Sequence, residues 1–278
     1  AAPPPLTGRH LALLALVAAG CGVWLLGFPV QPVLLGVLLL ASAMAVWVKP
    51  VSALMIIPAA LPILDLAPWS GRFYLDEFDA LLALTLAVGY ARTAPTRESW
   101  PPLIKAALIL LSVSFAISTL RALLPWQAID DNAFITYFSQ FNALRIGKGL
   151  VWALLFAGLM RRLTIRSGEE SVFCSTGLLR RGFISAEQSA FRWFAWGMTL
   201  GLAAVVAVMV REKILFGGLL NFSSDYRATG PFSAIHTGGA YVECYLAVAT
   251  PFLLYLIVTT RRWLVRLAGV ALLLASTY

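Results

Sequence analysis

Continuous apolar runs of helical length follow one another along the chain and constrain its fold more than any other feature. They cover roughly residues 10–28, 32–48, 51–67, 77–91, 103–123, 144–160, 193–210, 239–260 and 263–278. A helix that crosses the hydrocarbon core of a bilayer needs about 20 mostly apolar residues. Only α-helices and closed β-barrels satisfy their backbone hydrogen bonds in lipid, and barrel strands alternate apolar with polar residues. These uninterrupted runs therefore predict transmembrane helices.

The composition agrees with a chain that folds in lipid. Hydrophobic residues make up 60% of the 278 residues and charged residues only 12%, whereas soluble domains carry about 25% charge. We expect an all-α, polytopic transmembrane bundle with about nine spans, forming a single transmembrane domain over residues 1–278. The last run ends without a cap or a flanking charge, so we expect the protein to continue beyond Tyr278.

The distribution of basic residues predicts the orientation. Fourteen lysines and arginines fall in one set of loops and seven in the other, and cytoplasmic loops carry the excess. This places the N-terminus in the cytoplasm of a bacterial-type inner membrane, with a basic cytoplasmic loop at Arg161–Arg192. The net charge of +8 then marks cytoplasmic loops rather than a nucleic-acid partner.

Motifs of soluble enzymes are absent from the sequence. It contains no P-loop, no GxGxxG after a strand, no HExxH and no GxSxG. Two histidines and three cysteines without metal-ligand spacing predict no metal site, and nothing indicates another cofactor.

The most informative polar segment, NFSSDYRATGPFSAIHTGGAYVE at 221–243, lies in the last predicted outer loop and enters the next helix. Arg227 presents a planar guanidinium that suits phosphate, and Asp225 and Tyr226 precede it as further substrate-binding candidates. His236 lies at the predicted helix start and Glu243 just inside it, so we name both as catalytic candidates. The alternative is a solvated connector with an interfacial histidine and an aromatic belt.

A second basic pair lies at the outer start of the sixth run, where Arg145 and Lys148 are about one helical turn apart. One interpretation is that both side chains bind a phosphate or an acidic glycan as a second anion site. The alternative is that they only extend from the helix to the membrane interface. The fourth run begins with three carboxylates, Asp76, Glu77 and Asp79. Carboxylates at a helix start interact favourably with the helix dipole, and we prefer this interpretation to a pair that acts as general acid and base.

The span layout, RFYLDEFDALLAL and DYRATGPFSAIHTGGAYVECYLAVATPFLL together resemble the O-antigen ligase and polysaccharide polymerase superfamily. Arg227, Gly230, His236, Gly239 and Pro251 occupy places of the family pattern. The resemblance implies a metal-independent glycosyltransferase of the periplasmic face that uses a polyprenyl-diphosphate-linked glycan and a glycan or lipid acceptor. It also implies that Arg227 binds the diphosphate. The base histidine of the family lies in a large later loop beyond Tyr278, so His236 does not map onto it.

Other functions remain open from the sequence. A transporter or flippase for a lipid-linked or anionic substrate is one alternative, although its ionisable residues would lie near the middle of the membrane. A non-catalytic component of a polysaccharide export complex, with polysaccharide assembly proteins as partners, is another. Membrane lipids are expected partners in every case.

Overall fold

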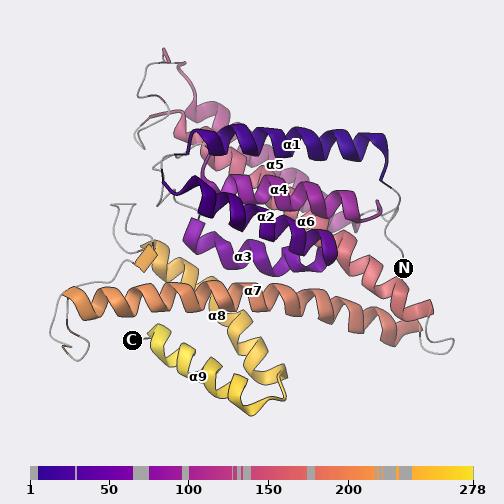
Figure 1. The fold of residues 1–278 in the computed structure, drawn as a ribbon, viewed down its shortest axis with the longest axis vertical. Helices are drawn as coiled ribbons and strands as arrows, with labels where there is room; N and C mark the ends of the chain where they lie inside the picture. The colour runs from indigo at the N-terminus through magenta and orange to yellow at the C-terminus, as the bar shows by residue number, and fades with distance from the viewer. Residues whose placement is uncertain are drawn as a thin grey trace.

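A computed structural model of the chain describes residues 6–28, 30–64, 75–95, 100–126, 128–129, 133, 139–173, 179–216, 218, 221, 230–231 and 240–277. Within these residues the structure is all-helical and has no strand, which confirms the predicted class (Figure 1). The α-helices are α1 Gly8–Leu26, α2 Pro32–Val48, α3 Ala53–Leu64, α4 Glu77–Arg92, α5 Pro102–Ala122, α6 Asn142–Phe173, α7 Leu179–Phe216, α8 Ala240–Thr259 and α9 Trp263–Thr277. A 3₁₀ turn, η1 at Pro50–Ser52, precedes α3.

Each α-helix falls on one predicted apolar run, but not every run gives a helix of spanning length. Five segments are long and apolar enough to cross a membrane: Gly8–Leu26, Pro102–Ala122, Asn142–Ile165, Ser189–Phe216 and Val242–Thr259. Helix α3 has only 12 residues, which is about 18 Å at 1.5 Å per residue. The structure therefore shows five candidate spans, and about nine crossings stays a prediction.

The expected basic loop at Arg161–Arg192 is wrong as a loop. Helix α6 continues to Phe173 and α7 begins at Leu179, so most of this segment is helical. The segment contains no proline, and its polar residues include several good helix formers. Polarity marks where the chain leaves the apolar part of the bundle, but it does not end a helix.

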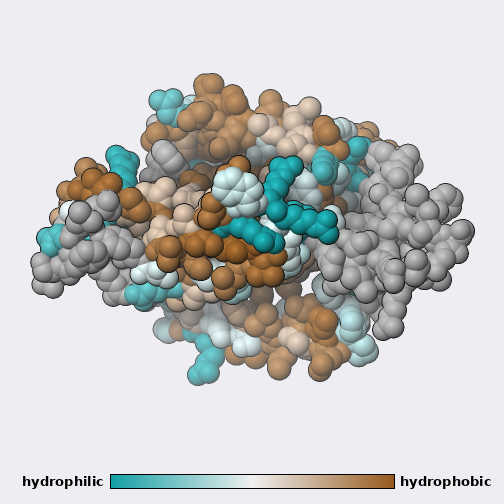
Figure 2. All heavy atoms as spheres, turned by 90° about the horizontal axis from the view of Figure 1, so that it is seen from below, coloured by the Kyte–Doolittle hydropathy of each residue, from teal (hydrophilic) through white to brown (hydrophobic). Residues whose placement is uncertain are grey.

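Helix α7 is the centre of the bundle and packs against α3, α6 and α8, while α4 lies against α1, α2 and α6 (Figure 1). Helices α1, α5 and α9 contain no buried residue although they are strongly apolar. Large hydrophobic side chains such as Leu26, Leu103 and Leu110 are 88%, 82% and 72% exposed. Figure 2 shows such hydrophobic surface over much of one face. Apolar surface of this extent is consistent with a protein that lies in a membrane.

Two glycines of α7 allow α3 to approach closely. A Cβ atom at Gly197 would lie 2.5 Å from the backbone oxygen of Met55, and one at Gly201 would lie 2.9 Å from the backbone oxygen of Pro58. Pro62 has no N–H, so the Pro58 carbonyl has no partner at the usual helical position. Small residues four apart are typical of close helix contacts in membranes. The prolines of α3 thus lie at a tight helix interface.

The two ends of the bundle differ in charge. At the end we call the basic end, Lys49 lies over the ring of Trp193 and Arg92 over that of Trp47, at 4.4 and 4.8 Å from the ring centroids. Arg161 and Arg162 lie in the same way over Trp100 and Tyr90. The opposite, acidic end holds the start of α4 with its carboxylates, the start of α6 and the end of α7. This separation follows the loop sets of the sequence, and the compartment that each end faces stays a prediction.

Candidate functional site

The acidic start of α4 forms a reciprocal cap. The backbone N–H of Asp79 donates to Oδ1 of Asp76 at 2.8 Å, and the N–H of Asp76 donates to Oδ2 of Asp79 at 3.0 Å. Both residues are buried. Such a capping box satisfies two N–H groups that the helix itself leaves without partners. The helix-start interpretation of these carboxylates therefore holds, and it fixes Asp79 in one orientation.

Asp79 also joins α4 to α6. Its Oδ2 accepts a hydrogen bond from the Lys148 ammonium, and its Oδ1 accepts one from the indole N–H of Trp152 at 2.7 Å. The Lys148 nitrogen also lies 4.0 Å from Oδ2 of Asp76. Lys148 and Trp152 are four residues apart and so lie on one face of α6. The carboxylate thus fixes the start of α6 against the start of α4.

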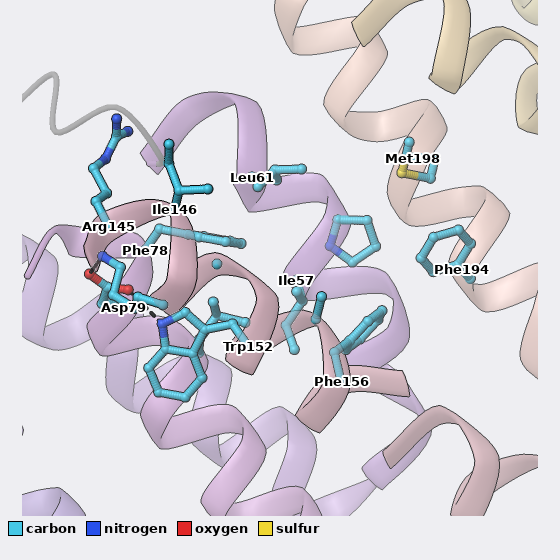
Figure 3. A pocket seen from close by; sticks show the side chains of 15 residues that line it. Ile57, Leu61, Phe78, Asp79, Arg145, Ile146, Trp152, Phe156, Phe194 and Met198 are labelled. Atoms are coloured by element: carbon cyan, nitrogen blue, oxygen red, sulfur yellow. Dashed lines mark hydrogen bonds and ion pairs between the residues drawn. The ribbon is translucent and has the colours of Figure 1, made fainter. Parts of the chain in front are cut away.

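A cavity of about 410 Å³ lies directly beside this ion pair (Figure 3). Helix α6 forms one wall with a stripe at helical spacing, α4 contributes Phe78 and Leu82, and α3 and α7 close the other side. Figure 3 shows Asp79 and Arg145 on one side of the cavity, and Phe194 and Met198 of α7 on the other. The complete lining is Ile57, Pro58, Leu61, Phe78, Asp79, Leu82, Arg145, Ile146, Lys148, Gly149, Trp152, Ala153, Phe156, Phe194 and Met198.

The cavity is polar at one end and apolar elsewhere. Its charged residues are Arg145, Lys148 and Asp79, which together carry one positive charge. From Arg145 to Phe156 the α6 wall extends 11 residues, or roughly 16 Å. This is about half of a hydrocarbon core that is ~30 Å thick. Phe156 lies at the apolar end, where its ring is 6.0 Å from that of Phe194. A molecule with an anionic group and an apolar chain matches this shape.

The structure brings together two of the residues that the sequence named. Arg145 and Lys148 line the same cavity, but Lys148 is paired with Asp79 rather than only extending to the interface. Arg145 is half-buried, and its side chain points away from Asp79 in Figure 3. A guanidinium presents a planar fork of donors that matches phosphate, so Arg145 is the better candidate of the two for binding such an anion.

The remaining candidates do not line this cavity or are not described. Glu243 lies exposed in the first turn of α8 and is not among the lining residues. Asp225, Tyr226, Arg227 and His236 lie outside the described residues. Within the described part of their loop, Gly230 has φ +59° and its N–H donates to Oε2 of Glu212 at 2.7 Å. Glu212 thus fixes the loop three residues after Arg227 to the end of α7.

Sequence reasoning missed two features of the site. Trp152 was not named, although it follows Lys148 at helical spacing and therefore shares its face. The burial of Glu77 was also missed: its side chain is fully buried, and neither carboxylate oxygen has a hydrogen-bond partner among the described residues. Its position in the first turn of α4 gives it a favourable interaction with the helix dipole.

Comparison with known proteins adds no assignment to this geometry. No protein-family model, no curated protein and no solved structure matches the chain. In the described part of the chain, no group of three or more His, Cys, Asp and Glu side chains is arranged to hold a metal ion. The function must therefore be argued from the cavity and its residues.

Proposed function

We propose that the protein is a membrane glycosyltransferase of the O-antigen ligase or polymerase type, which takes its glycan from a polyprenyl-diphosphate-linked donor. The observation that carries this proposal is the cavity beside the Asp79–Lys148 pair, with a polar end and a long apolar remainder. A lipid diphosphate combines the same two parts in one molecule. The acidic end of the bundle is then the periplasmic face of the bacterial inner membrane.

The polar end suits the diphosphate. An arginine binds phosphate oxygens with a planar fork of donors and keeps its charge at every physiological pH. Asp79 accepts a hydrogen bond from the Lys148 ammonium at this end of the cavity, and Arg145 lines the cavity beside them. Arg227 belongs to the loop that Glu212 and Gly230 attach to the end of α7, and it is the second proposed diphosphate ligand.

The apolar remainder suits the first isoprenyl units of the lipid. Phe78, Trp152, Phe156 and Phe194 provide aromatic surface along the cavity, and the lining carries no charge away from the polar end. Burial of hydrocarbon there gives little net hydrophobic gain, because the bilayer is equally apolar. The cavity instead orients the lipid, so that its diphosphate is held at the polar end.

The chemistry needs few further groups. An acceptor hydroxyl attacks the anomeric carbon of the donor sugar, the bond between that carbon and the diphosphate oxygen breaks, and the lipid diphosphate leaves. Guanidinium groups stabilise the negative charge that develops on the leaving group. A base takes the proton of the hydroxyl, and His236 and Glu243 are the candidates within this chain.

A transfer assay with the full-length protein in liposomes tests this proposal. The donor is a polyprenyl-diphosphate-linked glycan, and the product is the glycan joined to an acceptor. We expect Arg145→Gln and Arg227→Gln to lower the transfer rate by at least tenfold, because each removes charge stabilisation of the leaving group. The matched control is Arg121→Gln in the last turn of α5, which removes the same charge from a helix that does not line the cavity.

The same assay distinguishes glycan transfer from transport of the donor. A wild-type transfer rate in both Arg145→Gln and Arg227→Gln would contradict the assignment of these arginines. Movement of intact donor across the liposome membrane without any new glycosidic bond would instead indicate a transporter or flippase.

A further inference from the structure

A second hollow lies at the other side of α7, between α7, α8 and α9. Its inner part is a groove of about 540 Å³ lined almost entirely by apolar residues, with small alanines of α7 and α9 along it. Helices α8 and α9 pack tightly beside this groove, since a Cβ atom at Gly269 would lie 2.7 Å from Cγ1 of Ile257. None of its lining residues lines the cavity of the proposed active site.

The groove continues into a basic mouth of about 570 Å³, and both share Trp196 and Val265 as lining residues. The mouth is lined by Arg192 of α7, by Thr259, Thr260, Arg261 and Arg262 at the connection between α8 and α9, and by these two shared residues. This connection lies at the lower edge of Figure 1 and faces the viewer in Figure 2, where hydrophilic residues lie among hydrophobic ones. No carboxylate is among the lining residues.

The arginines of the mouth are available to a ligand. The guanidinium groups of Arg192, Arg261 and Arg262 make no hydrogen bond or ion pair with any residue that the structure describes, and all three are exposed. Arg266 differs, because its Nε donates to the Thr260 carbonyl at 2.5 Å and caps the end of α8. Three guanidinium groups line one hollow that has no carboxylate among its lining residues, and this arrangement favours the binding of an anion.

A buried hydroxyl group at the mouth points to the same conclusion. Thr260 lines the mouth with only 3% of its surface exposed. Its Oγ1 atom has no hydrogen-bond partner within the described residues. Other threonines of α4, α6 and α8, such as Thr85, Thr164 and Thr250, donate to a carbonyl of the preceding turn. A buried hydroxyl without a partner is costly, and a polar ligand atom would satisfy it.

We propose that this groove and its mouth bind an anionic phospholipid. Its phosphate lies among Arg192, Arg261 and Arg262, where Thr260 donates a further hydrogen bond, and one acyl chain lies in the apolar groove. Charge complementarity and the apolar length of the groove favour a lipid over a free anion or a protein helix. The site lies towards the basic end, away from the proposed active site, so it acts as a structural lipid site that stabilises the α8–α9 pair against α7.

The test measures the binding of phosphatidylglycerol to the purified protein in detergent, by native mass spectrometry and by thermal unfolding. Each basic residue contributes a factor of about five at an anionic interface, so Arg261→Gln with Arg262→Gln should weaken binding by about 30-fold. The matched control, Arg9→Gln with Lys105→Gln, removes the same charge from exposed residues at the starts of α1 and α5 and should leave binding unchanged. Ala271→Phe fills the groove and should lower lipid occupancy with all arginines present.

Other ligands give different results. Equal binding of phosphatidylcholine would overturn the role of the arginines, and equal binding of sn-glycerol 3-phosphate would show a site for a free anion. A stable dimer that excludes the lipid would show that a second copy of the chain covers the groove. Wild-type binding by the arginine double variant would overturn the proposal, as would wild-type binding by Ala271→Phe.

Discussion

Replacement of Gly197 by alanine should separate α3 from α7 at the wall of the candidate site. The added Cβ would lie 2.5 Å from the backbone oxygen of Met55, 2.8 Å from Cγ of Pro58 and 2.9 Å from Cα of Met55. Ordinary contacts begin at 3.4 Å, so α3 must move by about 3.4 − 2.5 = 0.9 Å. Two of the three atoms belong to the backbone of Met55 and cannot move aside by a change of rotamer.

The magnitude follows from two opposed effects. Overpacking of this kind costs about 1–3 kcal/mol, and the backbone contacts place Gly197 in the upper half of that range. Alanine is favoured over glycine in a helix by about 1 kcal/mol. We therefore expect Gly197→Ala to lower the free energy of unfolding by about 1–2 kcal/mol. Ile57, Pro58 and Leu61 move with α3, so the cavity also loses its fit to a ligand.

The assay is equilibrium unfolding in mixed micelles, followed by the fluorescence of the nine tryptophans. Gly149→Ala in α6 is the control, because a Cβ atom there has no heavy atom within 4 Å and only the helix preference changes. The control should be as stable as the wild type or up to about 1 kcal/mol more stable. If Gly197→Ala proves as stable as Gly149→Ala, the close packing of α3 on α7 is refuted.

Three further predictions concern the site, its loop and the orientation. A double-mutant cycle with Asp79→Asn and Lys148→Met should give a coupling free energy of about 1–2 kcal/mol in the same unfolding assay, because Asp79 is buried and Lys148 is only partly exposed. Full additivity of the two changes would contradict the ion pair. Gly230→Ala should cost about 1–2 kcal/mol because alanine is strained at φ +59°, and it should lower glycan transfer; an unchanged variant would mean that this loop does not hold Arg227 in place. In spheroplasts of a strain whose protein lacks its native cysteines, a membrane-impermeant maleimide should label Ile129→Cys and not Ala94→Cys, although both positions are exposed, since the basic end is predicted to face the cytoplasm. The reverse pattern would invert the proposed orientation.

Much of the helical layout could be predicted from the sequence, because apolar runs bounded by charges and prolines indicate which segments are helices in an apolar environment. Hydropathy did not predict where the helices end outside these runs. At Arg161–Arg192 we expected a loop from polarity, whereas the chain there has no proline and continues as helix at both ends. The run at 51–67 gave the η1 turn and then α3, whose 12 residues reach Leu64, the last residue described there.

The candidate site could be predicted only in part. The pair Arg145 and Lys148 was visible as two cations on one turn, but the partner Asp79 lies 69 residues away and depends on which helices are neighbours. The spacing of Gly197 and Gly201 in α7 is itself a sequence signal for a close helix contact. The hollow beside α9 has no signature in the sequence, because its arginines meet only through the packing of α7 against α8 and α9.

Direct binding of a polyprenyl diphosphate to the purified protein tests the central claim, that the cavity beside Asp79 and Lys148 holds the lipid-linked donor. The decisive variant is Gly149→Trp, which places an indole in the cavity at a position with open space around it. Its control is Gly20→Trp, at an equally open position on the exposed surface of α1. We expect tight binding by the wild type and by Gly20→Trp, and at least tenfold weaker binding by Gly149→Trp. Equal binding by all three proteins would contradict the claim.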